Sequence, residues 1–183
     1  MVFGPLNRRV SKSHRYFLVP EKPPPHGIIG AGQAMVFCKR RDTAKTVATA
    51  LHNQGHSVGV LSSSLDIVDR ANVIKRFRQG QVKVLVSTNV SSRGIDVEQV
   101  TFVVNYDLPD KPNEHNKNDY EVDCETYLHR IGRTGRFGKT GIAVNFVKND
   151  NDMRMLNAIE THFSKKIEGL DVTNIDEMEV KLN

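Results

Sequence analysis

The sequence has few cysteines and no long apolar run, and each shortage narrows the class of protein. Cys38 and Cys124 are its only cysteines, and neither belongs to a C-x-x-C pair. A reduced, intracellular compartment is therefore expected, rather than a disulfide-stabilised secreted domain. No apolar stretch approaches the roughly 18 residues of a membrane-spanning helix. Residues 1–10 lack the apolar stretch of a secretory signal, and the chain contains no internal repeat.

Length and charge allow more classes of protein than they exclude. The 183 residues are enough for one domain of ordinary size with a core of its own. The net charge of +5 and the pI of about 9.3 are compatible with a polyanionic partner without requiring one. The function has to be inferred from motifs.

From Gln33 onward, short apolar runs alternate with amphipathic stretches. The predicted strands span 34–38, 57–61, 82–87, 101–106 and 141–147, and the predicted helices span 42–54, 65–79 and 151–163. The helices have inward faces formed by Ala44, Val47, Ala48 and Leu51, by Ala71, Ile74 and Phe77, and by Leu156, Ile159 and Phe163. The alternation predicts an α/β fold, a parallel sheet with helices on both faces. Ligands of such sheets bind beyond the carboxyl ends of the strands, where we expect the functional loops.

The two ends of the chain differ from this central part. The N-terminal segment is basic and then proline-rich, which favours an extended connector after one short strand near 16–19. The C-terminal tail is acidic and is expected to be a solvated helix or partly disordered. We therefore divide the chain into a divergent N-terminal segment over 1–32, a central domain over 33–168 and an acidic tail over 169–183.

The segment His129–Gly138 concentrates arginine and glycine, reading His-Arg-Ile-Gly-Arg-Thr-Gly-Arg-Phe-Gly. Arg130, Arg133 and Arg136 are spaced by three, so they lie near one another on a helix or helical turn. Each planar guanidinium can grip two phosphate oxygens, and the interspersed glycines allow a phosphate to come close. A basic, glycine-rich turn on a solvated surface is the alternative, and for a lone R-x-x-R it would be preferred.

A second polar segment follows the predicted strand over 82–87 and ends at Asp96. Thr88 and Asn89 stand at the strand end, where a hydroxyl, an amide or a main-chain N–H can meet a phosphate backbone. Asp96 can accept a hydrogen bond from a ribose hydroxyl. The alternative is a polar strand-to-helix connection with Asp96 as a cap, and for this segment alone it is the better interpretation.

Taken together, these segments resemble the second RecA-like lobe of a DEAD-box RNA helicase. The arginine segment is similar to the arginine-finger motif of that family almost letter for letter. The resemblance extends from Gln33 onward and includes the motifs Val-Phe-Cys at 36–38, Ser-Thr-Asn at 87–89, Arg-Gly-Ile-Asp at 93–96 and Asn-Tyr-Asp-Leu-Pro at 105–109. Asn89 and the runs at 97–100, 125–128 and 163–168 resemble the branch that remodels messenger RNA–protein particles during nuclear export.

The resemblance implies roles at a nucleotide site shared by two lobes. Arg133 and Arg136 would be arginine fingers, which reach the γ-phosphate of ATP held by the other lobe. Gly94 would allow close approach to the ribose, which Asp96 would hold. Phe137 would lie against the adenine, although a plain core aromatic explains it equally well.

The resemblance also implies an RNA site and a coupling residue. Thr88 and Asn89 would hold RNA phosphates, so binding would be largely independent of sequence. Arg70 fills the last place of a Q-x-x-R motif whose first place holds Ile67, and a solvated helix residue is the alternative. His129 would bridge to the acidic motif of the other lobe, although a lone histidine is more often a structural hydrogen-bond partner.

The chain lacks several parts that this family needs for catalysis. It contains no D-E-A-D string. It also has no Walker A loop: Gly138-Lys139-Thr140 resembles the end of one, but the first glycine of the motif is absent and the segment precedes a predicted strand instead of following one. The cofactor implied is ATP with Mg²⁺, the magnesium being held mainly by an N-terminal lobe that is missing here, and no metal site is expected in this chain. Alone, the chain is expected not to hydrolyse ATP.

Two further segments depart from the family pattern. Residues 20–32 replace a helix of the family, which predicts that one face of the sheet is incompletely covered. Residues 110–123 are predicted to form a mobile surface loop.

The implied partners are RNA, the N-terminal RecA-like lobe, an inositol-hexakisphosphate-dependent export activator and a nucleoporin. A monomer is expected, located in the cytoplasm and nucleus and at the cytoplasmic face of the nuclear pore. Two other functions stay open: an isolated lobe that acts as an RNA- or protein-binding regulatory module, and the equivalent lobe of a DNA helicase. The arginine segment and the Thr-Asn start of the 88–96 loop argue against the DNA helicase.

Overall fold

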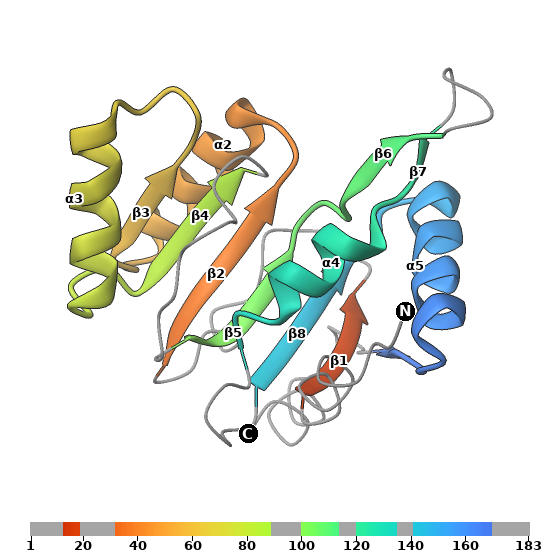
Figure 1. The fold of residues 1–183 in the computed structure, drawn as a ribbon. Helices are drawn as coiled ribbons and strands as arrows, with labels where there is room; N and C mark the ends of the chain where they lie inside the picture. The colour runs from red at the N-terminus through yellow and green to blue at the C-terminus, as the bar shows by residue number, and fades with distance from the viewer. Residues whose placement is uncertain (1–12, 19–31, 89–99, 114–119, 135–140, 170–183) are drawn as a thin grey trace, which may run out of the picture.

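The computed structural model describes residues 13–18, 32–88, 100–113, 120–134 and 141–169 (Figure 1). Its main sheet has seven strands in the order β3-β4-β2-β5-β8-β1-β9, and every pair in it is parallel. The strands are β1 (Ser13–Leu18), β2 (Gln33–Cys38), β3 (Val58–Leu61), β4 (Val84–Thr88), β5 (Val100–Asn105), β8 (Gly141–Phe146) and β9 (Glu168–Gly169). The helices are α2 (Arg41–Asn53), α3 (Ile67–Arg78), α4 (Cys124–Ile131) and α5 (Asp150–Phe163). The predicted α/β fold is confirmed.

The central strands β2, β4 and β5 are buried on both faces of the sheet, apart from exposed Thr101. Such strands carry near-continuous apolar runs, because helices cover both sides of a parallel sheet. Met35 of β2 lies opposite Leu85 of β4 on one side and Val103 of β5 on the other. The carboxyl ends of the strands meet at the upper edge in Figure 1.

One face of the sheet packs against α2. The four predicted inward residues of this helix are all buried, in a core that also holds Val36, Val86 and Val104. Phe102 and Phe146, on the same face, are only 5% and 1% exposed. The expectation of a sheet face with too little cover is therefore wrong.

The opposite face packs against α3, α4 and α5. From α3 only Phe77 is fully buried, and Ala71 is exposed against prediction, because this helix lies beside the edge strand β3. From α5, Leu156 and Ile159 are buried as predicted, with Phe163 packed against them. None of the described helices is long and apolar enough to cross a membrane.

A small antiparallel hairpin replaces part of the predicted loop over 110–123. It pairs β6 (Asp110–Pro112) with β7 (Tyr120–Val122), and Lys111 and Glu121 form a cross-strand ion pair of 3.1 Å. Residues 114–119 lie outside the described residues. The expectation of a mobile surface loop over 110–123 is wrong for these two strands, the second of which leads directly into α4.

Candidate functional site

Helix α4, which carries the start of the arginine segment, is defined by residues at both of its ends. At its start, the Asp123 carboxylate accepts hydrogen bonds from the Thr126 N–H at 2.9 Å and the Thr126 hydroxyl at 2.6 Å. The Asp123 N–H donates to the Pro109 carbonyl at 2.9 Å, which ties the helix to the chain after β5. At its end, a Cβ added to Gly132 would lie 3.0 Å from the Leu128 carbonyl oxygen, so glycine suits this turn.

The cap at Asp123 should make the stability of α4 depend on pH. Burial on its own would raise the pKa of Asp123, but the hydrogen bonds from Thr126 outweigh it and hold the pKa below its ordinary value of 3.8. Because the folded-state pKa is depressed, the added stability is present above pH 3.8 and is lost as the pH falls through the lower value. We expect Asp123→Ala to lower the free energy of unfolding by about 0.5–2 kcal/mol at pH 7.

Urea unfolding at pH 7 and at pH 3 measures both effects. Asp123→Asn is the control, because asparagine keeps the capping acceptor without titrating. Equal stability of the alanine variant and the unmodified chain at pH 7 would contradict the role of Asp123 as a cap.

Arg130 points into the core, not toward a ligand. Its side chain is 0% exposed, and Nη1 donates to Asn105 Oδ1 at 3.0 Å and to the Asp107 carbonyl at 2.7 Å. The guanidinium lies 5.1 Å from the ring centroid of Phe37, within cation–π range. Burial lowers the pKa of Arg130 to about 10, so the group stays charged at neutral pH. The general expectation that guanidinium groups of this segment are available to grip phosphate oxygens is therefore wrong for Arg130.

His129 and Arg133 flank Arg130 and lie closer to solvent. His129 is exposed, and Arg133 is half-buried with its Nε donating to the His129 carbonyl at 3.2 Å. The next residue, Thr134, is 2% exposed and donates from its hydroxyl to the Thr101 carbonyl at 2.9 Å. Thr101 stands near the start of β5. The described part of the arginine segment, residues 129–134, therefore crosses a face of the sheet toward the amino end of β5, not beyond the carboxyl ends as expected.

Thr88 lies at the predicted carboxyl edge of the sheet, at the end of β4. It is 4% exposed, and its hydroxyl has no hydrogen-bond partner in the part of the chain that the structure describes. A buried hydroxyl without a partner costs free energy, which a polar ligand could recover. Arg70, half-buried in the first turns of α3, follows the neighbouring strand β3.

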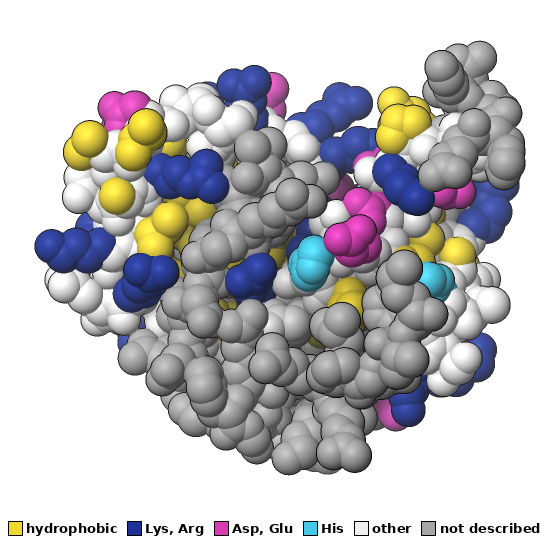
Figure 2. Space-filling model, in the orientation of Figure 1, with side chains coloured by type: hydrophobic (Ala, Val, Ile, Leu, Met, Phe, Trp, Pro, Cys, Tyr) yellow, Lys and Arg dark blue, Asp and Glu magenta, His cyan; other side chains and the backbone are white. Residues whose placement is uncertain are grey.

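The same edge holds basic residues that the sequence analysis did not single out. Lys39, Arg40 and Arg41 are exposed at the start of α2, and Cys38 before them lies opposite Thr88. Arg40 is the N-cap of α2 but makes no side-chain capping bond. Helix N-termini favour anions. The sequence feature that could have identified these residues is the run of three basic side chains directly after the predicted strand over 34–38. In Figure 2, Lys and Arg side chains lie over α3 and along the upper edge of the molecule.

Charged groups join the ends of β2, β5 and β8. Asp107 accepts a hydrogen bond from the Lys39 N–H at 2.8 Å and pairs with Lys148 Nζ at 2.5 Å. Lys39 also pairs with Asp110, at the start of the hairpin. Burial raises the pKa of the Cys38 thiol to about 12, and Asp107 adds to the rise, so Cys38 is no thiolate nucleophile at neutral pH.

The remaining predicted site residues, Asn89, Gly94, Asp96, Arg136 and Phe137, lie outside the described residues. The predicted site residues that the structure describes come from separate elements: Arg70 from α3, Thr88 from β4, His129 from the end of α4, and Arg133 from the turn that follows α4. Within the described ranges, no group of three or more His, Cys, Asp or Glu could hold a metal ion.

Comparisons with known proteins give a consistent result. Residues 28–138 match the family described as the helicase conserved C-terminal domain. The human ATP-dependent RNA helicase DDX19A is 54% identical over 155 residues, which are 84% of this chain and 31% of that protein. The chain thus spans about a third of the length of that relative.

Solved structures of the DEAD-box protein Dbp5 are similar in fold. Its C-terminal domain superposes with a TM-score of 0.81 at 33% identity, covering 94% of this chain and 98% of that domain. Saccharomyces cerevisiae Dbp5 bound to RNA and ADP BeF3 gives 0.83 at 32%, covering 100% and 49%. The same yeast protein as an L327V variant, bound to Nup159, Gle1 H337R, IP6 and ADP, gives 0.78 at 32%, covering 92% and 44%.

Proposed function

The chain belongs to the DEAD-box RNA helicases, in which it is the C-terminal RecA-like lobe and most resembles the mRNA-export branch, and from this premise we propose that it supplies arginine fingers to an ATPase shared by two lobes. The other lobe would carry the Walker A and D-E-A-D motifs that this sequence lacks. ATP would bind between the lobes, with RNA held across both. Alone, the chain would not hydrolyse ATP.

The observation that carries the proposal is the difference in burial between neighbouring residues of the arginine segment in and after α4. Arg130 is fully buried, whereas Arg133 is only half-buried and His129 is exposed. The residues left toward solvent are those to which the family resemblance assigns the γ-phosphate and the other lobe. A guanidinium at this position stabilises charge that develops on the transferring phosphoryl group. Arg136 would act as the second finger.

The nucleotide and its metal would be held mostly by residues other than those described. Gly94, Asp96 and Phe137 would contact the ribose and the adenine. The Arg133 guanidinium is a donor of the kind that phosphate oxygens accept, so it fits ATP. ATP with Mg²⁺ supplies the phosphoryl group that is transferred to water, and the N-terminal lobe would hold most of the magnesium.

RNA would lie along the edge where β4 and β2 end and α3 begins. Thr88, Asn89 and Arg70 would contact its phosphates, with the basic turn from Lys39 to Arg41 beside them. An oxygen of a phosphate would supply the partner that the Thr88 hydroxyl lacks. Contacts of this kind position a strand without reading its sequence.

The partners of the whole protein follow by similarity alone. Structures of yeast Dbp5 contain RNA, Gle1 with IP6, and Nup159. We extend these to a parent protein that works as a monomer with RNA, an IP6-dependent activator and a nucleoporin. It would remodel RNA–protein complexes in mRNA export at the nuclear pore, and so be found in nucleus and cytoplasm.

RNA binding in the presence of a nucleotide tests this function. The assay mixes the chain with a separately produced N-terminal lobe of a related export helicase, here called the two-lobe mixture. Fluorescence anisotropy of labelled single-stranded RNA is measured with and without ADP–BeF3. We expect tight binding only when both lobes and the nucleotide are present, with similar affinity for unrelated RNA sequences and weaker affinity for DNA. RNA binding by the chain alone, unchanged by the other lobe, would support the regulatory binding module instead.

Thr88→Val is expected to weaken RNA binding by the two-lobe mixture. Valine keeps the shape of threonine and removes the hydroxyl. A hydrogen bond to a charged group is worth about 1.5 kcal/mol or more, which corresponds to about a tenfold rise in Kd. Thr101→Val, near the start of β5 at the other end of the sheet, is the matched control and should change Kd little. Equal Kd for the two variants would exclude Thr88 from the RNA site.

A further inference from the structure

Two buried polar side chains, one helical turn apart, fix α4 to the sheet. The Tyr127 hydroxyl accepts from Asn145 Nδ2 at 3.2 Å, and Arg130 Nη1 donates to Asn105 Oδ1 at 3.0 Å. Asn105 and Asn145 lie opposite each other on β5 and β8 and share a hydrogen bond of 2.9 Å. A continuous chain of hydrogen bonds thus joins the helix to two adjacent strands, and rolling the helix would break it at both contacts.

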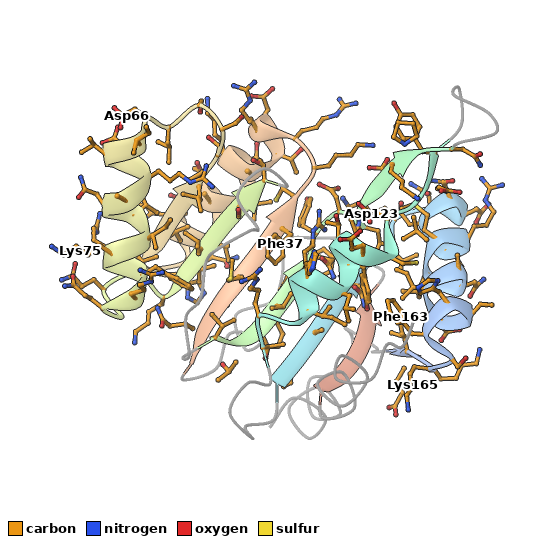
Figure 3. The ribbon with its side chains drawn as sticks, viewed as in Figure 1. Phe37, Asp66, Lys75, Asp123, Phe163 and Lys165 are labelled. Atoms are coloured by element: carbon orange, nitrogen blue, oxygen red, sulfur yellow. The ribbon has the colours of Figure 1, made fainter. Side chains whose placement is uncertain are left out.

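Further contacts set the position of Arg130 itself. Its Nη1 also donates to the Asp107 carbonyl at 2.7 Å, and its guanidinium lies 5.1 Å from the ring centroid of Phe37 in β2. Figure 3 labels Phe37 near the middle of the sheet. An apolar side chain of similar volume often stabilises a protein as well as a buried charged one. The hydrogen bonds of Arg130 are directional, however, and an apolar side chain such as methionine in its place could not donate them. Arg130 therefore specifies where α4 lies more than how stable it is.

The turn that carries Arg133 starts from this fixed point. The Arg133 N–H donates to the Arg130 carbonyl at 3.1 Å, and the Thr134 N–H donates to the Ile131 carbonyl at 3.2 Å. On the far side of Arg133, the buried Thr134 hydroxyl is fixed to the Thr101 carbonyl. Arg133 thus projects from a short turn held at two buried points, one on each side.

We propose that Arg130 is a positioning residue, which orients α4 and the following turn so that Arg133 faces the γ-phosphate while Arg130 touches neither nucleotide nor RNA. The inference rests on the proposed function, in which Arg133 meets the γ-phosphate. A displacement of a catalytic group by about 1 Å can lower a rate by about a hundredfold. Loss of Arg130 should therefore act on catalysis through Arg133.

Steady-state kinetics of the two-lobe mixture provide the first test, at a temperature where circular dichroism finds every variant folded. Arg130→Met should lower kcat for RNA-stimulated ATP hydrolysis by about 10- to 100-fold, with KM for ATP and Kd for RNA within about twofold. Tyr127→Phe, which keeps the ring and removes one hydrogen bond of the chain, should lower kcat severalfold. Arg154→Met, on the exposed side of α5, is the matched control. A rise in KM for ATP with unchanged kcat would overturn the proposal.

A double variant separates positioning from an independent effect. If Arg130 acts through Arg133, Arg130→Met should lower kcat no further once Arg133 is alanine. Losses that multiply in the double variant would overturn the proposal.

Hydrogen exchange of the chain alone tests the positioning without any activity. In Arg130→Met, the amides of Arg133 and Thr134 should exchange about tenfold faster or more, because local opening of the turn becomes easier. The amide of Val47 in α2 should be unaffected. Unchanged exchange at Arg133 would overturn the proposal. If the unmodified two-lobe mixture hydrolyses no ATP, the proposed function fails, and exchange still decides whether Arg130 fixes the turn.

Discussion

Replacing Arg133 with alanine is expected to lower RNA-stimulated ATP hydrolysis by the two-lobe mixture by about 10³-fold or more. The guanidinium would stabilise charge on the transferring phosphoryl group, and alanine leaves that charge without a partner in a site from which water is excluded. Binding of RNA should change little, because Arg133 follows α4 and the RNA site is assigned to β4 and α3. Phosphate release at saturating ATP and RNA measures the loss.

Two further variants make this result specific to Arg133. Arg133→Lys keeps the charge but not the planar, bidentate donor, so it should lose most of the activity as well. Arg154→Ala removes an exposed arginine of α5 and should retain full activity. An Arg133→Ala variant with activity within about tenfold of the unmodified chain would be inconsistent with an arginine finger at this position.

Phe37→Ala is expected to produce the largest loss of stability, about 3–5 kcal/mol in the free energy of unfolding. Phe37 lies in the central strand β2, is 0% exposed, and packs in one core with Met35 and Leu85. Its ring also faces the Arg130 guanidinium, so alanine would leave a cavity beside a buried charge. Urea unfolding at pH 7 gives the free energy.

Phe163→Ala is the matched control for this substitution. Phe163 is half-buried at the end of α5, next to the edge-on ring of His162. Figure 3 labels it on this outer helix, whereas Phe37 is labelled at the middle of the sheet. Replacing Phe163 should cost clearly less, since solvent can fill part of the space. Equal losses for the two variants would show that the core around β2 does not dominate stability.

The sheet was predictable because burial on both faces leaves a simple signal. The runs at 34–38 and 101–106 predicted β2 and β5 within about a residue at each end. Helix α2 was equally predictable from the sequence, since its apolar residues repeat along one face and Gly55, with φ of +88°, ends it as expected. In each case, local periodicity and the tertiary environment favour the same structure.

The hairpin could not be predicted in this way. Its strands have three residues each, and β6 reads Asp-Lys-Pro, which lacks both alternation and strand propensity. The hairpin is held by backbone pairing of β6 with β7 and by the ion pair between Lys111 and Glu121. These are contacts between segments, which no single stretch of sequence reports.

The burial of Arg130 was hidden for a related reason. Spacing by three places the arginines near one another but does not say which of them faces the core. The partners of Arg130 are Asn105 and, beyond it, Asn145, which lies 40 positions further along the chain. The roles of Thr88, His129 and Arg133 stay predictions, and those of Asp96, Arg136 and Phe137 concern residues outside the described ranges.

The central claim is that this chain is one half of an ATPase that works only with its other half. The most direct test is phosphate release from ATP in the presence of RNA, measured for the chain alone, for the N-terminal lobe alone and for the two-lobe mixture. We expect phosphate release well above the sum of the separate lobes only in the mixture, and loss of that excess with Arg133→Ala. A folded chain that leaves the activity of the N-terminal lobe unchanged would contradict this claim.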